Sequence, residues 1–209
     1  MLSIFWRHFL ETFQEASTEV ITQPIEPAEE KGGGFWRFLL DLVQTLALSV
    51  ALFLGINAVT ARVLVDGFSM RPTLDNGQYV LVNKIAFRSS LPEYGDIVVF
   101  HFPVDPNQDF IKRVMGLPGD EISVSDGKMI INGYSLSEPY IAASPAYTGK
   151  WTVPEGQIFV LGDNRNNSSD SHSWGPVPME NVVGKAITVY WPPSDWQIIK
   201  HIKIEIKTP

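Results

Sequence analysis

One long apolar segment limits what this chain can fold into more than any other feature. Residues 38–61 form a run of 24 residues dominated by leucine, alanine, valine and phenylalanine. At the rise of an α-helix this length suffices to cross a hydrocarbon core of roughly 30 Å. Asp41 and Asn57 lie near its two ends, where their polar atoms can reach lipid headgroups. The segment predicts a single transmembrane anchor over 35–62, and a buried helix of a soluble protein is the weaker alternative.

Two properties of this segment stay open in the sequence. Val59-Thr60-Ala61 resembles a small-residue processing site, so a cleavable signal sequence is a second interpretation, although the long preceding region favours an anchor. Orientation is also open, because two basic residues near each end make a tie under the positive-inside rule. These residues are Lys31 and Arg37 before the segment, and Arg62 and Arg71 after it.

The region before the anchor divides into two parts. In residues 1–21 apolar side chains recur every three or four positions, which predicts an amphipathic helix that lies in a membrane interface or packs on protein. Residues 22–34 contain two prolines, three glutamates and three consecutive glycines. Such a composition cannot bury a core, so we interpret 22–34 as a flexible linker.

Residues 63–209 change to short runs of β-branched and aromatic residues bounded by Gly, Pro, Asn and Asp. Asp-Gly and Asn-Gly pairs flank 128–131, which is a strong hairpin signal. Near the end, Ile202, Ile204 and Ile206 alternate with charged residues, as in a half-buried strand. We therefore expect a mainly β fold, an antiparallel sheet domain of sandwich or barrel-like form, with an excursion around 139–156. The remaining predicted strands are 79–83, 97–102, 110–115, 157–161 and 186–191.

Composition excludes several classes of function. The net charge is −7 and no cluster of lysine and arginine occurs, which argues against a nucleic-acid partner. The chain contains no cysteine, so thiol nucleophiles, disulfides and thiolate metal sites are impossible. Any covalent catalysis must use an oxygen or nitrogen nucleophile.

Ser69 is the candidate nucleophile. It lies in Gly67-Phe68-Ser69-Met70-Arg71-Pro72-Thr73-Leu74, where glycine permits unusual backbone dihedrals and proline holds its neighbour extended. Such a serine is presented to solvent, although an ordinary turn has the same composition. A serine needs a base that removes its proton. Among the histidines, only His101 and His172 are placed to join it.

A lysine that loses its charge through desolvation is the other possible base. On a strand over 110–115, Lys112 shares one face with Phe110 and Val114, whereas Arg113 lies on the other. Arginine does not deprotonate in proteins, so Lys112 is the candidate and Arg113 is not. Lys84, at the end of strand 79–83, is the second choice, and a charged Lys112 that reaches solvent is the structural alternative.

A third segment, 162–175, is dense in hydrogen-bonding side chains and follows an apolar run. It suits a loop that holds another group in place. Calcium is the rival, because Asp163, Asn164 and Asn166 offer oxygen donors. Arg165 lies among these donors, and the glycine and final glutamate of an EF-hand are missing, so we expect no metal site.

Together, the three segments resemble the bacterial type I signal peptidases, which are membrane-bound serine proteases. Gly67 to Leu74 match the family's nucleophile motif, Gly-x-Ser-Met-x-Pro-Thr-Leu. Lys112 to Asp120 match its lysine motif, Lys-Arg-Val-x-Gly-x-Pro-Gly-Asp. Gly162 to Arg165 and Ser168 to Ser171 match its Gly-Asp-Asn-Arg and Ser-x-Asp-Ser loop. Three long motifs in the right order make the resemblance specific, and it runs from the membrane segment to Trp191.

The resemblance implies a function. Ser69 would be the nucleophile and Lys112 the general base of an endopeptidase that removes signal peptides from exported preproteins. Gly67, Ser69 and Met70 would form the substrate and oxyanion segment, with small side chains favoured at the first and third positions before the cut. Supporting roles would fall to Ser168, which holds the amine, to Asp170, which braces the loop, and to His172 and Arg113. No cofactor or metal is implied.

The resemblance also implies a location and leaves alternatives. The protein would span the bacterial plasma membrane once, with the catalytic domain outside the cytoplasm and the lipid bilayer as a partner. Self-cleaving Ser/Lys repressors use the same chemistry, but they are soluble and carry a DNA-binding domain. A membrane-tethered β domain that only binds exported chains would lose the dyad, whereas Ser69 and Lys112 are both present.

The chain departs from the family's usual residues at two positions, and at a third it lacks a group that some members have. Gly67 stands where some members have a hydroxyl, so the second oxyanion donor is unknown. Asn166 replaces the usual aspartate, and His172 replaces the usual arginine. We predict that pairing of His172 with Asp170 depends on pH and is strongest while the imidazole is protonated, because arginine stays charged and histidine does not. Restoring arginine at position 172 would change the pH profiles of activity and thermal stability.

Overall fold

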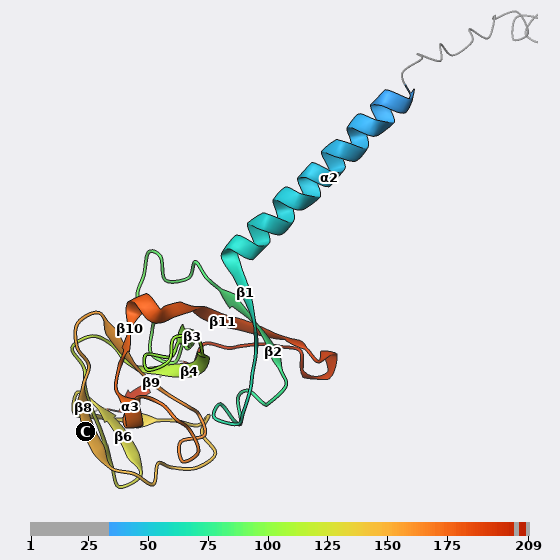
Figure 1. Ribbon diagram of the computed structural model, residues 1–209. Coiled ribbons are helices and arrows are strands. Elements are labelled where there is room, and N and C mark those ends of the chain that lie inside the picture. The colour runs from blue at the N-terminus through green and yellow to red at the C-terminus, as the bar shows by residue number, and fades with distance from the viewer. Residues whose placement is uncertain (1–33, 203–204, 208–209) are drawn as a thin grey trace, which may run out of the picture. The chain divides into compact units, whose positions relative to one another are not determined.

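The computed structural model describes residues 34–202 and 205–207, and the chain divides into two units after Ser49. The predicted amphipathic segment 1–21, and the linker up to residue 33, lie outside the described residues. Helix α2, Gly34–Val59, covers residues 38–59 of the apolar segment and has no buried residue, whereas Thr60 and Ala61 begin the first strand. It is long and apolar enough to cross a membrane. Figure 1 shows α2 and the β domain.

Two hydroxyl side chains within α2 donate to the backbone of the helix itself. The hydroxyl of Thr45 donates to the carbonyl of Asp41 at 2.7 Å, and that of Ser49 donates to the carbonyl of Thr45 at 2.8 Å. A hydroxyl that is satisfied four residues back costs little in an apolar surrounding, where unpaired polar groups are expensive. These residues therefore do not prevent α2 from serving as a membrane helix.

Two antiparallel sheets form the β domain (Figure 1). The first sheet has eight strands in the order β1-β2-β11-β3-β4-β9-β10, with β12 paired to β11. The second has five strands in the order β13-β7-β6-β5-β8. The expected fold class, mainly antiparallel β with one N-terminal apolar helix of membrane-span length, is confirmed.

The strands of the first sheet are β1 Thr60–Leu64, β2 Tyr79–Asn83, β3 Ile97–His101, β4 Asp109–Gly116, β9 Gln157–Leu161, β10 Val177–Pro178, β11 Val182–Trp191 and β12 Gln197–Ile198. Those of the second are β5 Glu121–Ser125, β6 Lys128–Ile131, β7 Tyr134–Ser137, β8 Gly149–Thr152 and β13 Glu205–Lys207.

The predicted strands 79–83, 128–131 and 157–161 coincide with β2, β6 and β9. Asp126 and Asn132, beside β6, adopt positive φ, as the Asp-Gly and Asn-Gly turns require. At the end of the chain, β13 pairs with β7 over 205–207. Between β9 and β11 lie a short helix, α3 Ser171–Trp174, and the 3-10 turn Met179–Asn181. A second 3-10 turn, Pro193–Asp195, follows β11.

The segment 139–156, which we expected to be an excursion from the strands, contains one short strand. Its residues 149–152 form β8, the outer strand of the second sheet, which pairs with β5. Trp151 packs against the apolar cluster between the second sheet and β9, where Val153 is buried. The sequence signal is weak because the strand has only four residues and one large apolar side chain.

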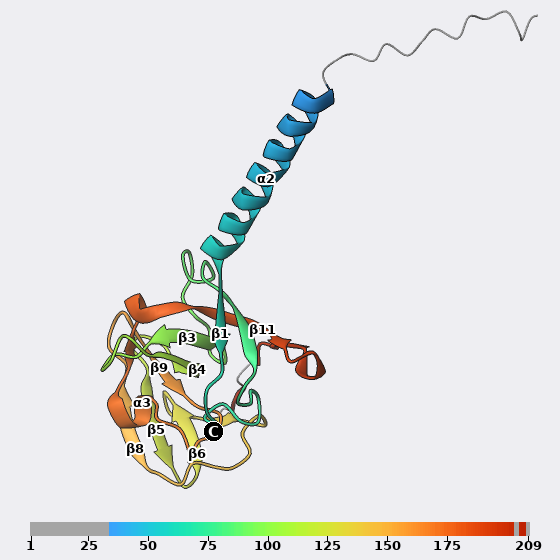
Figure 2. The ribbon, with the colours of Figure 1, turned by 45° about the vertical axis from the view of Figure 1, so that its right-hand side comes forward.

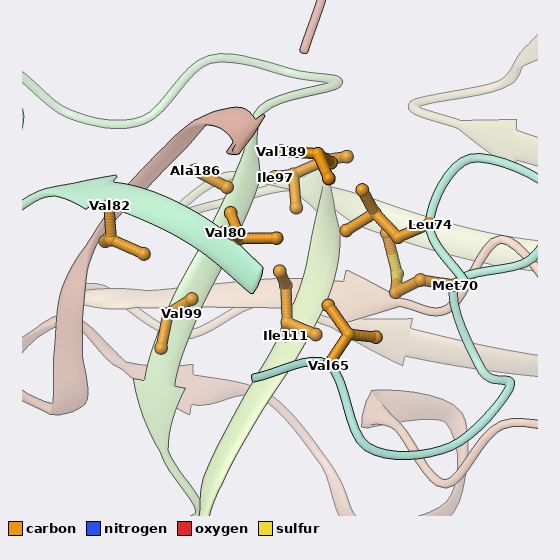
Figure 3. Close-up of a cluster of buried hydrophobic side chains, with 10 residues drawn as sticks. All are labelled: Val65, Met70, Leu74, Val80, Val82, Ile97, Val99, Ile111, Ala186 and Val189. Atoms are coloured by element: carbon orange, nitrogen blue, oxygen red, sulfur yellow. The ribbon is translucent and has the colours of Figure 1, made fainter. Parts of the chain in front are cut away.

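A buried apolar cluster lies beneath the segment between β1 and β2 (Figure 3). Met70 and Leu74, both 1% exposed, come from that segment and meet side chains of β2, β3, β4 and β11. The cluster ties an otherwise irregular segment to the first sheet, because burying two such side chains stabilises their position by about 1.5–3 kcal/mol each. Figure 2 shows β3, β4 and β9 side by side, which brings the loops after β1 and β9 toward β4.

Candidate active site

Ser69 lies in the segment between β1 and β2, and its surroundings hold it in a turn. Gly67 has φ of +98°, a conformation that side chains rarely adopt, and its N–H donates to Asn76 Oδ1 at 2.7 Å. The N–H of Leu74 donates to the carbonyl of Met70 at 2.9 Å. With Met70 and Leu74 buried below, the half-exposed Ser69 is presented away from the core.

Lys112 comes from β4 and reaches Ser69 through an apolar surrounding. Its side chain is buried, and Nζ lies 5.1 Å from the centre of the Phe110 ring. Nζ is 2.8 Å from Ser69 Oγ, and it donates to the carbonyl of Ile111 at 3.0 Å. Burial lowers the pKa of Lys112 from 10.5 to about 8, against the opposing charges of Asp170 and Asp163. A neutral amine beside a serine hydroxyl can accept its proton.

Arg113 points to the opposite face of β4, as strand alternation requires. Its guanidinium binds the Asp163 carboxylate with two hydrogen bonds, of 2.7 and 2.6 Å, and both side chains are fully buried. A third hydrogen bond, 2.8 Å long, reaches the carbonyl of Gly95. Arg113 therefore holds the loop after β9 against β4, while its neighbour Lys112 faces Ser69.

The loop that follows β9 binds the backbone of the serine segment. The N–H of Asn164 donates to the carbonyl of Ser69 at 2.9 Å, and its side-chain amide donates to that of Phe68 at 3.2 Å. Gly162 packs so closely that a Cβ there would lie 2.4 Å from the Ser69 carbonyl oxygen and 2.2 Å from Ser168 Oγ. Only glycine fits this contact, which fixes the position of Ser69 relative to the loop.

Asp170 and His172 brace the same loop. Asp170 is fully buried, accepts from the N–H of Gly162 at 2.9 Å and caps α3 through the N–H of His172. The ring nitrogen Nδ1 of His172 lies 2.6 Å from Asp170 Oδ1, and the ring stacks on Tyr147 at 4.2 Å. The expected pair is formed, and its dependence on pH stays a prediction.

Asn166, the other departure from the family motif, uses both ends of its amide. Its Oδ1 accepts from the N–H of Ala146 at 2.7 Å, and its Nδ2 donates to the carbonyl of Ser144 at 2.9 Å. An aspartate has no N–H for the second of these bonds. The asparagine thus joins the loop after β9 to the segment that precedes β8.

Two expected roles are corrected by the structure. Ser168 Oγ is buried but forms no hydrogen bond with any described residue, so it does not hold the lysine amine here. Lys112 Nζ instead lies within hydrogen-bond distance of Ser69 and Ile111, and Ser168 packs on Gly162. The side chain of Met70 belongs to the core and does not line the cleft described below.

The other candidate bases do not replace Lys112. His101 pairs with Asp109 at 2.7 Å, with about half of each side chain exposed, and Lys84 is exposed beyond the end of β2. Within residues 34–202 no group of three or more acidic, histidine or cysteine side chains could hold a metal ion. Asp163, offered above as a calcium donor, is bound by Arg113. The sequence did not predict the ion pair between Asp163 and Arg113, because it does not show which side chain a buried carboxylate contacts.

A cleft of about 530 Å³ opens over the Ser69 and Lys112 side chains. One wall comes from β1 and the residues after it, and the other comes from the start of β4. β1 is the first strand of its sheet, so within the described residues one of its edges has no partner strand. The cleft is lined by Val63, Leu64, Asp66, Ser69, Gln108, Asp109, Phe110, Ile111, Lys112 and Ser169.

Comparison with known proteins places these features in context. Residues 38–191 match the family model described as signal peptidase, peptidase S26. The signal peptidase I of Leptolyngbya laminosa is 43% identical over 164 residues, which cover 74% of this chain and 80% of that protein. The probable signal peptidase I-2 of Synechocystis sp. is 46% identical over 161 residues, 73% of either chain. A crystal structure of a signal peptidase I from Enterococcus faecalis is 36% identical and covers 46% of this chain and 97% of its own, with a TM-score of 0.43.

Proposed function

The chain belongs to the signal peptidase family, peptidase S26, and is a serine endopeptidase; we propose that it removes signal peptides from exported preproteins with Ser69 as nucleophile and Lys112 as general base. The observation that carries this assignment of roles is the 2.8 Å separation between Lys112 Nζ and Ser69 Oγ. The burial that lowers the pKa of Lys112 to about 8 supports it, because about a tenth of the amine is then neutral at pH 7, far more than at an unshifted pKa.

The reaction begins with proton transfer. The neutral amine of Lys112 takes the hydroxyl proton of Ser69 as Oγ attacks the carbonyl carbon of the scissile peptide bond. The tetrahedral intermediate collapses, the C–N bond breaks, and the lysine ammonium returns its proton to the departing amine. Water then attacks the acyl-enzyme ester with Lys112 again as base, which frees Ser69 and the carboxylate of the signal peptide.

Charge on the tetrahedral oxygen needs hydrogen-bond donors. We assign the Ser69 N–H as one donor, and among the described residues it has no acceptor of its own. The neighbouring N–H of Gly67 donates to Asn76, and glycine has no hydroxyl, so Gly67 does not supply the second donor. Gly67 serves instead to set the turn that aims the Ser69 N–H.

The substrate lies in the cleft as an extended peptide. The unpaired edge of β1 borders this cleft and can add a peptide strand by main-chain hydrogen bonds. Small side chains are accepted at the first and third positions before the cut. The described contacts of Gly162, Asn164 and Asp170 keep the serine segment in register with β4, with Arg113 holding their loop from below.

The location follows from the apolar helix. We assign α2 as a single membrane anchor in the bacterial plasma membrane, and the chain from β1 onward as the catalytic domain on the extracytoplasmic side; residues 60–62, which the sequence placed in the anchor, pair with β2 instead. α2 supports the anchor, because it is apolar, of spanning length and without a buried residue. A substrate whose signal peptide lies in the same bilayer would then meet the enzyme at the membrane surface.

The test is cleavage of a preprotein by the full chain in detergent, measured across pH. Ser69→Ala and Lys112→Ala should each lower kcat/KM by at least about a thousand-fold, because each removes a reacting group. In the wild-type enzyme kcat/KM should rise with pH and level off above about 8, since only the neutral amine of Lys112 is a base.

Ser125→Ala and Lys128→Ala are matched controls, because these exposed residues face each other where β5 pairs with β6. They should cleave as the wild type does. Cleavage that survives in Lys112→Ala, or a pH profile without a rise toward 8, would show that Lys112 is not the base.

A further inference from the structure

Acidic residues outnumber basic ones among the residues that line the cleft. Three of its lining residues are ionisable, namely Asp66, Asp109 and Lys112. Asp66 follows β1 on one wall, and Asp109 begins β4 on the other. Arg71, two residues after Ser69, does not line the cleft. Its guanidinium lies over the Phe68 ring and pairs with Asp75. A peptide in the cleft therefore meets a carboxylate on each wall.

The two carboxylates keep their charge in different surroundings. Asp66 is exposed and forms no hydrogen bond or ion pair with any residue in the described part of the chain. Asp109 is 43% exposed and lies 2.7 Å from Nδ1 of His101. An imidazole that carries no charge offsets none of the negative charge of Asp109, so the proposal is tested with histidine neutral. Both groups then act on a substrate as full negative charges.

Lys112 does not balance them in the reacting enzyme. The form of Lys112 that accepts the Ser69 proton is the neutral amine, and the amine is buried beneath the cleft. In this form the cleft carries two negative charges and no positive one among its lining residues. A substrate residue near the cut is thus placed in a negative potential from both sides.

We propose that Asp66 and Asp109 make the enzyme select substrates by charge, favouring preproteins with a basic residue beside the cleavage site and rejecting those with an acidic one. This inference rests on the proposed function, because it assigns the cleft to the substrate peptide. It adds a charge requirement at positions that do not need a small side chain. Like charges placed close together disfavour a complex, and surface pairs of opposite charge favour it modestly.

The test compares peptides that differ in one residue. Three series carry Lys, Gln or Glu at the second position before the cut, or at the first or second position after it. The full chain in detergent is assayed at about pH 9, where histidine is neutral, and at low ionic strength. In at least one series we expect kcat/KM to fall in the order Lys, Gln, Glu, with the Lys peptide roughly three- to ten-fold above the Glu peptide.

The variants locate the effect. Asp66→Asn and Asp109→Asn should each reduce the ratio of the Lys to the Glu peptide, and the double variant should bring it near one. Asp126→Asn is the control, because Asp126 is exposed in the β5–β6 turn and asparagine also tolerates its positive φ. It should leave the ratio unchanged. Both peptides are measured on one preparation, so a loss of folded enzyme cancels in the ratio.

Salt gives a second measurement that needs no variant. Raising the ionic strength to about 0.5 M should reduce the ratio in the wild-type enzyme, because exposed charges are screened. Equal kcat/KM for Lys and Glu peptides in all three series, or a ratio that survives in the double variant, overturns the proposal. The Gln peptides separate this result from the proposed function, since they are still cleaved by Ser69 and Lys112 if charge selection alone is wrong.

Discussion

At the scale of the residue, two neighbouring basic residues of β4 have different surroundings and therefore different chemistry. Lys112 and Arg113 follow each other on β4 and are both buried, yet Arg113 meets a carboxylate at 2.6 Å whereas Lys112 meets a serine. A guanidinium retains its charge, so burial with Asp163 gives a permanent ion pair. An ammonium without a carboxylate at contact distance loses part of its charge to desolvation. The same strand thus carries a permanently charged cation on one face and, on the other, the amine that we propose as the base.

The cost of burying this ammonium predicts an effect on stability. The pKa of Lys112 is lowered from 10.5 to about 8 by burial, so between these pH values the unfolded chain binds a proton that the folded chain does not. The free energy of unfolding therefore rises with pH across this window, and below about 8 the folded protein bears the full cost. Lys112→Met removes it. We expect this variant to be inactive but more stable than the wild type at pH 7, by roughly 2–3 kcal/mol, with the difference shrinking toward pH 10.

Denaturant unfolding of the full chain in detergent, followed by tryptophan fluorescence at both pH values, measures this difference. Lys128→Met is the control, since Lys128 is exposed on β6 and should show little change at either pH. If Lys112→Met is no more stable at pH 7, or if its advantage is equal at both pH values, the amine is not held partly neutral by burial.

At the scale of the element, the site depends on three segments that meet only in the folded chain. The serine segment is attached to the core by Met70 and Leu74, and the loop after β9 is attached to β4 by the Arg113 to Asp163 pair. Asn164 and Gly162 then join the loop to the serine segment. Because every attachment is made by a buried side chain or a backbone hydrogen bond, Ser69 stays aligned with Lys112.

The contact at Gly162 predicts a loss of activity without loss of fold. A methyl group there would meet the Ser69 carbonyl oxygen at 2.4 Å, so Gly162→Ala must move the serine segment or the loop. A displacement of this size can cost about a hundred-fold in rate, so we expect kcat/KM to fall by roughly ten- to a hundred-fold. Cleavage assays with circular dichroism of the same sample measure both properties.

Gly55→Ala provides the comparison, because nothing lies within 4 Å of the added methyl group in α2. Its activity should equal that of the wild type. A Gly162→Ala enzyme with normal kcat/KM would mean that the close contact does not set the position of Ser69.

At the scale of the whole molecule, one apolar helix leads directly into a β domain that carries the site. α2 ends at Val59 and β1 begins at Thr60, so the helix and the strand that borders the cleft are continuous in the chain. Tethering an enzyme to the surface where its substrate lies raises the local substrate concentration. If α2 anchors the enzyme as we propose, the enzyme gains this advantage for signal peptides in the same membrane.

This arrangement predicts the behaviour of the chain in bacterial cells. The expressed protein should stay with the membrane fraction after alkaline extraction, as a spanning helix requires. Protease added to intact spheroplasts should digest residues 63–209, because we place the catalytic domain outside the cytoplasm. A cytoplasmic marker protein in the same sample must remain intact. Digestion that occurs only after lysis would reverse the orientation, and release by alkaline extraction would contradict the anchor.

Local patterns were enough to predict much of this protein. Helix and strand periods, and Asp-Gly or Asn-Gly turns, depend on a few neighbouring residues. They were therefore enough to predict the apolar helix within 38–61 and the strands at 79–83, 128–131 and 157–161. The choice of Lys112 over Arg113 also followed from side-chain chemistry alone. Family resemblance supplied the roles that chemistry left open.

Tertiary structure decided the contacts between distant residues. Ser69 and Lys112 are 43 positions apart, and their 2.8 Å approach depends on how the serine segment packs over β4. The same packing buries Met70, leaves Ser168 Oγ without a hydrogen-bond partner among the described residues, and pairs Asp163 with Arg113. No local pattern contains this information, because strand order and register select which side chains meet. The sequence by itself thus determined the elements and their chemistry, and the folded chain determined which of those groups touch.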